Sequence, residues 1–139
     1  MTTARARATV RVTRALHELT RFDEALDSYD QASRLVLDSP WGWNGKAYVL
    51  AAMGRYDDAL ASVKHAIALA PEDATFYDSQ GQLFMMMDCV QDARPLFEHA
   101  VALDAAFVTS WQNLAVVCRR LGREAEAEAA EKQVHTLGG

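Results

Sequence analysis

The chain has 139 residues, of which half are hydrophobic and about a quarter are charged. This length and composition indicate one globular domain with a sizeable core, and they exclude a disordered chain. The formal net charge of −5 argues against general nucleic-acid binding, which needs a broad basic surface. Because there are only three Pro and seven Gly, and Ala, Leu, Arg and Glu are abundant, we expect an all-α fold.

The sequence predicts no membrane span, because no stretch approaches about eighteen consecutive apolar residues. The Arg-rich start, MTTARARATVRVTRAL, lacks the apolar region and the cleavage site of a secretory signal and resembles a transit peptide only loosely. We expect it to form a structural helix. Cys89 and Cys118 have no zinc-like partner spacing, which predicts two free thiols and a cytoplasmic location.

A single period of 34 residues runs through the chain. Three of the columns with this spacing are Ala25, Ala59, Ala93 and Ala127; Leu35, Leu69, Leu103 and Leu137; and the turn column Thr20, Gly54, Asp88 and Gly122. Several independent columns at one period identify a repeat protein. Each unit is predicted to be a helix–turn–helix pair, with units at about 6–39, 40–73, 74–107 and 108–139.

The units resemble tetratricopeptide repeats (TPR), whose signature is W-x₂-L-G-x₂-Y, then A-x₃-F, then P. The matching segments are Trp111-x₂-Leu114-Ala115-x₂-Cys118, Tyr77-x₂-Gln80-Gly81-x₂-Phe84, Ala93-x₃-Phe97 and Pro71. The first two contain substitutions. The resemblance covers roughly residues 6–137. It implies an all-α, right-handed solenoid of about four antiparallel helix pairs, which form a single domain over residues 1–139.

Local signals refine the helix boundaries. Gly54 and Gly122 suit helix C-termini that need a positive φ. In the first unit we expect a helix near 5–19 and a second near 22–37. Pro95 falls inside the second helix of the third unit, which predicts a kink or a late start.

The last unit ends in EAEAEAAEKQVHTLGG, which keeps only a thin apolar stripe. Glu131 stands where earlier units place a residue against the next repeat. A polar outer face is typical of a terminal capping helix, so we expect the array to end here. A boundary within a longer chain stays open as the alternative.

The sequence offers no constellation that supports catalysis. His65 and His99 occupy equivalent positions about 10 Å apart, too far to share a metal, and we expect them to be solvated surface residues. Cys118 occupies a core column and Cys89 a turn, so both are expected to act as small hydrophobes. There is no phosphate-binding loop, HExxH or GxSxG motif. We therefore expect no enzymatic activity, no cofactor and no metal site.

The resemblance implies that the first helices of the units line a concave groove in which extended peptides bind. Carried over column by column, the predicted groove residues are Arg7, Arg11, Arg14, Trp41, Asn44, Tyr48, Asp78, Gln82, Asn113 and Arg119. The expected first helices hold seven basic residues against two acidic ones, which favours an acidic partner. The alternative is that the Arg stripe only solubilises an uncovered helix. The columns of the family's carboxylate clamp contain Arg14 as their one suitable residue, so that mode of binding is disfavoured.

Trp41, Gly45 and Tyr48 share one helical face at i, i+4 and i+7. Two aromatic side chains around the hollow at Gly45 would form an anchor pocket for a partner side chain. The alternative is that Trp41 folds back over the 37–40 connection. Met85 and Met86 either offer an adaptable contact on the same layer or belong to the core.

We therefore predict a non-catalytic protein–protein interaction module, or adaptor, that holds a peptide segment of a partner in its groove. One alternative is a structural scaffold that self-associates through an open end of the array, since the first helix has no separate cap. The other is a regulatory module of a larger enzyme or assembly. The expected partner is a protein or peptide, with homo-oligomerisation left open, and neither nucleic acid nor a membrane is expected to bind.

Overall fold

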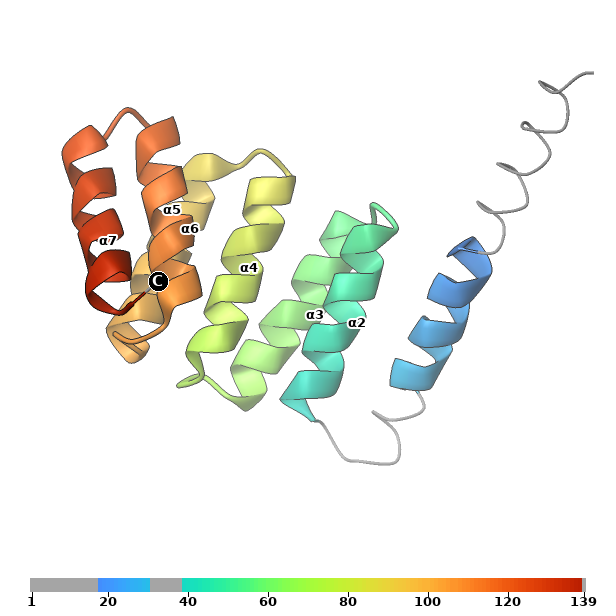
Figure 1. Cartoon of the computed structure of the whole chain (residues 1–139). Helices are drawn as coiled ribbons and strands as arrows, with labels where there is room; N and C mark the ends of the chain where they lie inside the picture. The colour runs from blue at the N-terminus through green and yellow to red at the C-terminus, as the bar shows by residue number, and fades with distance from the viewer. Residues whose placement is uncertain (1–17, 31–38, 139) are drawn as a thin grey trace, which may run out of the picture.

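The computed structural model describes residues 18–30 and 39–138, and every regular element in these ranges is a helix. The helices with defined bounds are α2 (Pro40–Ala52), α3 (Tyr56–Leu69), α4 (Ala74–Met86), α5 (Val90–Leu103), α6 (Val108–Arg120) and α7 (Glu124–Thr136). A further helical segment, residues 18–30, precedes α2 (Figure 1). The all-α prediction is therefore confirmed.

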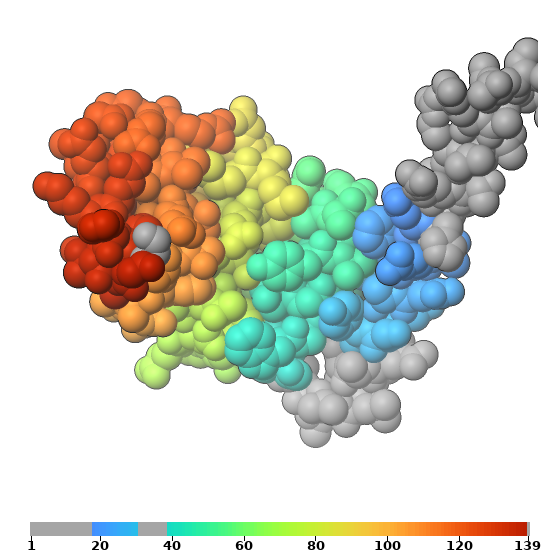
Figure 2. Space-filling view, in the orientation of Figure 1, coloured from blue at the N-terminus to red at the C-terminus, as the bar shows by residue number. Residues whose placement is uncertain are grey.

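The helices form two layers. Helix α2 packs on α3, α4 on α5 and α6 on α7, and successive pairs meet through α3 with α4 and α5 with α6. In Figure 1, α2, α4 and α6 lie on the near side and α3 and α5 lie behind them. Figure 2 shows the helices stacked in chain order from the 18–30 segment (blue) to α7 (red). This arrangement is a solenoid of helix pairs, as the repeat period predicts.

The turn inside each pair depends on one residue with a positive φ. The φ angles of Gly54, Asp88 and Gly122 are 78°, 60° and 77°. At each turn the next backbone N–H donates to the carbonyl five residues earlier at 2.8 Å: Arg55 to Leu50, Cys89 to Phe84 and Arg123 to Cys118. This is the Schellman motif, which satisfies the last carbonyls of a helix. The conformation predicted for the two glycines is confirmed, and Asp88 adopts it as well.

The first unit differs from the prediction at its turn. The 34-residue columns place a turn at Thr20, but residues 18–30 form one continuous helix, so that prediction is wrong. Thr is β-branched and does not adopt the left-handed conformation that Gly54 supplies in the next unit. The rest of the two predicted helices, near 5–19 and 22–37, lies outside the described residues.

Helix α5 continues through Pro95 and begins at Val90, which is the column where α3 begins with Tyr56. The predicted late start is therefore wrong. Pro95 leaves only the carbonyl of Gln91 without its helical donor, and both residues are exposed, so water can supply the missing hydrogen bond.

Small side chains allow the two helices of each pair to approach closely. Ala59, Ala93 and Ala127 are fully buried. In the third unit the contact is closer still, because a Cβ on Gly81 would lie 2.6 Å from the Phe97 ring. These contacts fix the second helices behind the first ones and leave one face of α2, α4 and α6 uncovered.

Candidate peptide-binding face

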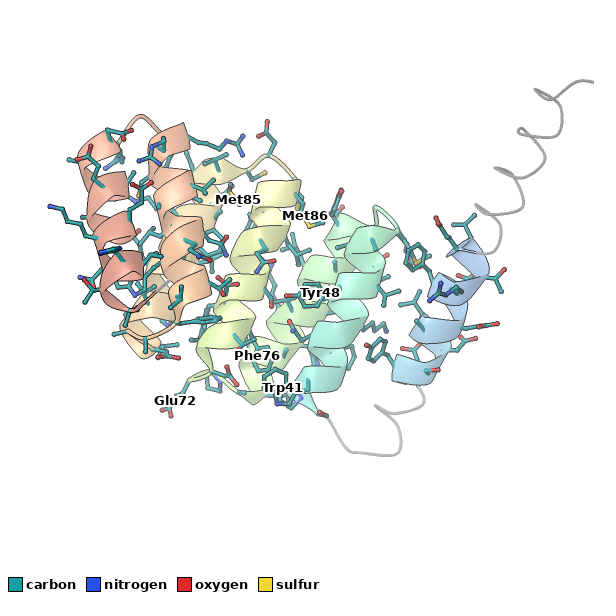
Figure 3. All side chains as sticks on the ribbon, viewed as in Figure 1. Trp41, Tyr48, Glu72, Phe76, Met85 and Met86 are labelled. Carbon is teal, nitrogen blue, oxygen red and sulfur yellow. The ribbon has the colours of Figure 1, made fainter. Side chains whose placement is uncertain are left out.

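Four large apolar side chains are more than half exposed on the layer of first helices. Trp41 and Tyr48 on α2, Met86 on α4 and Val116 on α6 have 58, 51, 54 and 51 % of their surface exposed. Figure 3 shows Trp41, Tyr48 and Met86 along the α2–α4 junction. A row of apolar side chains on one face is typical of an interaction surface, whereas isolated ones are ordinary. We call this row the apolar ridge.

A pocket of about 250 Å³ opens on this face between α2 and α4. Its lining consists of Asn44, Ala47, Tyr48, Ala51, Ala52, Val63, Ser79, Gln82, Leu83 and Met86. None of these residues carries a charge. Tyr48 and Met86 are the large exposed members of the lining (Figure 3), Ala52 is a small exposed one, and the Tyr48 hydroxyl lies 3.4 Å from Ser79 Oγ. We call this hollow the α2–α4 pocket.

The corresponding place between α4 and α6 is organised by a buried carboxylate. Asp78 is only 3 % exposed. Its Oδ1 accepts hydrogen bonds from Ser110 Oγ at 2.6 Å and Asn113 Nδ2 at 3.1 Å, and its Oδ2 accepts one from Gln82 Nε2. Buried carboxylates require such partners. Three predicted groove residues thus meet in one cluster, where Asp78 links neighbouring repeats.

The anchor pocket predicted around Gly45 is wrong in its geometry. A Cβ on Gly45 would lie 2.5 Å from the Tyr29 ring, so a side chain of the 18–30 helix already fills that hollow. Trp41 packs edge-on against Phe76 of the next unit, with ring centroids 5.0 Å apart, while most of its surface stays exposed. Neither of the two alternatives drawn from the sequence predicts this contact between Trp41 and Phe76.

Every cation that the structure describes on the first helices is already ion-paired. Lys46 pairs with Asp30 at 2.7 Å, and Arg120 with Asp88 at 2.6 Å. The Arg120–Asp88 pair is exposed on both sides and contributes little to stability. The described part of the face therefore has no unpaired positive charge, and Arg7, Arg11 and Arg14 lie outside the described residues.

Arg119 lies on α6, at the C-terminal end of the stack, and its guanidinium is ion-paired with α7. It pairs with Glu124 at 2.9 Å and with Glu131, both on α7. The hydrogen bond from Arg119 lowers the pKa of the Glu131 carboxyl. Its column contains Ala51 and Met85, which face the following unit in the earlier repeats. The charged network therefore places polar groups on the α6–α7 pair, and the capping role of this pair stays a prediction.

The histidines and cysteines have structural surroundings. His65 stacks on Trp43 and His99 on Tyr77, with ring centroids 4.1 and 4.2 Å apart, so these exposed rings are packed rather than simply solvated. Burial raises the pKa of the Cys118 thiol. Among residues 18–30 and 39–138, no group of three metal-ligating side chains comes together. Nor does any helix in those ranges have the length and apolar character to cross a bilayer.

The α2–α4 pocket depends on residues that the sequence analysis did not select. The small side chains of Ala51 and Ala52 leave the pocket open, whereas the larger Met85 and Met86 occupy the same two columns in the next unit. A comparison of side-chain volumes along the 34-residue columns, in addition to charge and aromaticity, would have indicated this pocket. Asn44, Tyr48 and Gln82 are the predicted groove residues that line the pocket.

Comparison with known proteins agrees with this architecture. The family profile of the tetratricopeptide repeat matches residues 13–74, 44–87 and 80–135. No curated protein sequence matches the chain significantly. Among solved structures, MamA residues 41 to the end from Desulfovibrio magneticus RS-1 is 23 % identical, with a TM-score of 0.74 over 89 % of this chain and 70 % of that one. A second structure of MamA is 22 % identical, with a TM-score of 0.73 over 84 % of this chain and 68 % of that one.

A third similar structure contains a bound peptide. It is the second TPR of Spaghetti (RPAP3) bound to the HSP90 peptide SRMEEVD, which is 16 % identical, with a TM-score of 0.68 over 77 % of this chain and 98 % of that one. At these identities the likeness establishes the fold alone.

Proposed function

Because the chain belongs to the tetratricopeptide repeat family, whose repeats generally form non-catalytic protein-interaction modules, we propose that it binds a peptide segment of a partner protein along α2, α4 and α6. The observation that carries this proposal is the apolar ridge. Leaving four large apolar side chains in water is unfavourable, and a partner that covers them gains the corresponding hydrophobic free energy. The similar repeat structure that holds an HSP90 peptide supports this use of the fold.

The proposed partner is apolar where it meets α2 and α4. The described cations of this layer are already paired, and the α2–α4 pocket has no charged lining residue. An acidic stretch in the partner would therefore have to meet Arg7, Arg11 and Arg14. Such a contact would weaken with salt, whereas binding to the apolar ridge would not.

Self-association is the second candidate function, and it would use an end of the stack. At the C-terminal end, Arg119 forms ion pairs with Glu124 and Glu131. A second copy that stacked there would have to desolvate these charges, which is costly. The polar end therefore favours the peptide-binding module over end-to-end assembly at α7.

A selection for binding peptides tests the proposal. Random dodecapeptides displayed on messenger RNA are selected on the full chain, and their affinities are measured by fluorescence anisotropy. Trp41→Lys and Val116→Lys place a charge on the apolar ridge, and we expect each to weaken binding about tenfold or more.

The matched controls are Leu69→Lys and Leu103→Lys. They change leucines that are 38 and 40 % exposed on the second helices, and we expect them to leave the affinity unchanged. Equal losses in the ridge variants and in these controls would refute the assignment of the face.

A further inference from the structure

We infer that the α2–α4 pocket is a specificity site for one uncharged apolar side chain of the bound peptide, of the size of Leu, Met or Phe. Beside this side chain, Asn44 accepts a hydrogen bond from a donor of the peptide. This inference deepens the proposed function, since it rests on a peptide lying along the face. The occupant is a segment of another protein. Three features of the pocket carry the inference: its volume, its uncharged lining and its unpartnered acceptor.

The pocket exists because small residues stand where the next repeat has large ones. Ala51 lies in the column of Met85, and Val63 lies in the column of Phe97. In the next unit, Phe97 is buried in the core cluster of α5, α6 and α7, and Met85 packs against that cluster. At the α2–α4 junction the smaller side chains of Ala51 and Val63 stand in these two columns and line the pocket.

The size of the pocket fits one side chain. An engineered cavity of about 150 Å³ with an apolar lining binds a benzene molecule, and this pocket measures about 250 Å³. A Leu, Met or Phe side chain fits into such a volume. Met86 lies at the rim, and its unbranched side chain can adapt to occupants of different shape.

Asn44 adds a polar requirement at this site. It is only 6 % exposed, and its Oδ1 has no hydrogen-bond partner within the described part of the chain. A buried acceptor without a donor costs free energy, so native structures nearly always satisfy it. Its counterpart in the next unit, Asp78, has three donors. The chain itself covers Oδ1, but Asn44 lines the pocket, so a turn of its side-chain amide would let Oδ1 accept a hydrogen bond from a backbone N–H of a bound peptide.

The uncharged lining excludes a charged occupant. A Lys, Arg, Asp or Glu side chain in the pocket would lose its hydration and would meet no opposite charge, which is strongly unfavourable. An apolar side chain loses only its contact with water, which is favourable. The pocket therefore selects against charge at one position of the peptide.

The test fills the pocket without changing the apolar ridge. Ala51→Met copies the residue that the next repeat carries at this column, and Ala68→Met is the matched control on an exposed position of α3. With the selected dodecapeptides as probes, we expect Ala51→Met to weaken binding about tenfold or more and Ala68→Met to have no effect. Asn44→Leu, which removes the acceptor at similar volume, is expected to weaken binding about two- to tenfold.

A scan of the peptide identifies the occupant. Replacing each peptide residue by Ala should reveal one uncharged apolar position whose loss is large in the wild-type chain and small in Ala51→Met. Should Ala51→Met not fold, a methyl resonance of Val63, which lines the pocket and is buried beneath the apolar ridge, provides an independent measurement in the wild-type chain. A shift of this resonance on peptide binding supports the inference, and an unchanged resonance overturns it.

Two other results separate this inference from the proposed function. If peptides bind Ala51→Met as tightly as they bind the wild type while Trp41→Lys lowers their affinity, the pocket assignment fails and the peptide-binding function stands. If no selected peptide responds to any variant on the face, both fail. If light scattering shows that the chain alone forms a dimer that Ala51→Met abolishes, the occupant is a second copy, and the inference is wrong.

Discussion

The contact between Gly81 and Phe97 yields a prediction that can be worked out from the geometry. A Cβ at position 81 would lie 2.6, 2.8 and 3.0 Å from three carbons of the Phe97 ring. The ring is fully buried, so it cannot move aside without cost. The second unit has Ala47 and Val63 in the same two columns. Gly facing Phe in the third unit and Ala facing the smaller Val in the second therefore fill the same space with different pairs of side chains.

The single substitutions should each destabilise the chain. Gly81→Ala gains about 1 kcal/mol of helix propensity and loses about 1–3 kcal/mol to overpacking, so its net cost is about 0–2 kcal/mol. Replacing Phe by Ala in a core costs about 3–5 kcal/mol. Phe97→Val keeps two methyl groups worth about 0.8 kcal/mol each, so it should cost about 1.5–3.5 kcal/mol.

The double variant should cost less than the two single costs added together. Once Phe97 is replaced by Val, the methyl group that Gly81→Ala introduces has space, and the overpacking cost of about 1–3 kcal/mol disappears. Urea unfolding followed by circular dichroism gives the four free energies of the cycle. Ala47→Gly is the control, with an expected cost of about 2 kcal/mol, because helix propensity contributes about 1 kcal/mol and the buried methyl group about 0.8 kcal/mol. Additivity within about 0.5 kcal/mol would refute the reasoning.

Three further predictions concern polar groups. Asp78→Ala should lower the free energy of unfolding by about 2–4 kcal/mol, because three donors lose a buried carboxylate; a loss below about 0.5 kcal/mol in urea unfolding would contradict the role assigned to it. Because burial raises the pKa of Cys118, iodoacetamide should alkylate Cys89 faster at pH 8, and equal rates would contradict this. The unfolded Cys118 thiol ionises at its ordinary value of 9.0, so the stability from the neutral thiol should be complete below that pH and decline above it. Arg119→Gln should raise the carboxyl pKa of Glu131 toward its ordinary value of 4.5, which NMR titration measures; an unchanged titration would show that the ion pair does not form in solution.

The repeat architecture could be predicted from the sequence because its causes are local and periodic. A 34-residue spacing of Ala and Leu columns requires the same packing in every unit. The positive φ of Gly54 and Gly122 follows from the need to end a helix within one residue. Where a column contained an unsuitable residue the prediction failed, since Thr20 cannot supply that conformation and the helix runs through it.

The lining of the α2–α4 pocket was predicted only in part. Asn44, Tyr48 and Gln82 were selected from the sequence and line it, because position within a helix decides which face a residue takes. What each side chain meets depends on the helix beside it, and the spacing of one helix contains no information on that. The sequence pattern therefore offered no sign that Tyr29 fills the hollow at Gly45.

The tertiary structure alone decided which polar groups are satisfied within the chain and which are left over. Asp78 and Asn44 occupy the same column, yet one accepts three hydrogen bonds and the other's Oδ1 accepts none within the described residues. The difference arises because Ser110 and Asn113 stand across from Asp78, while Phe76 and Ser79 occupy the equivalent columns beside Asn44. The sequence by itself determined the repeated scaffold, and the packing of neighbouring units determined where the pocket between α2 and α4 opens.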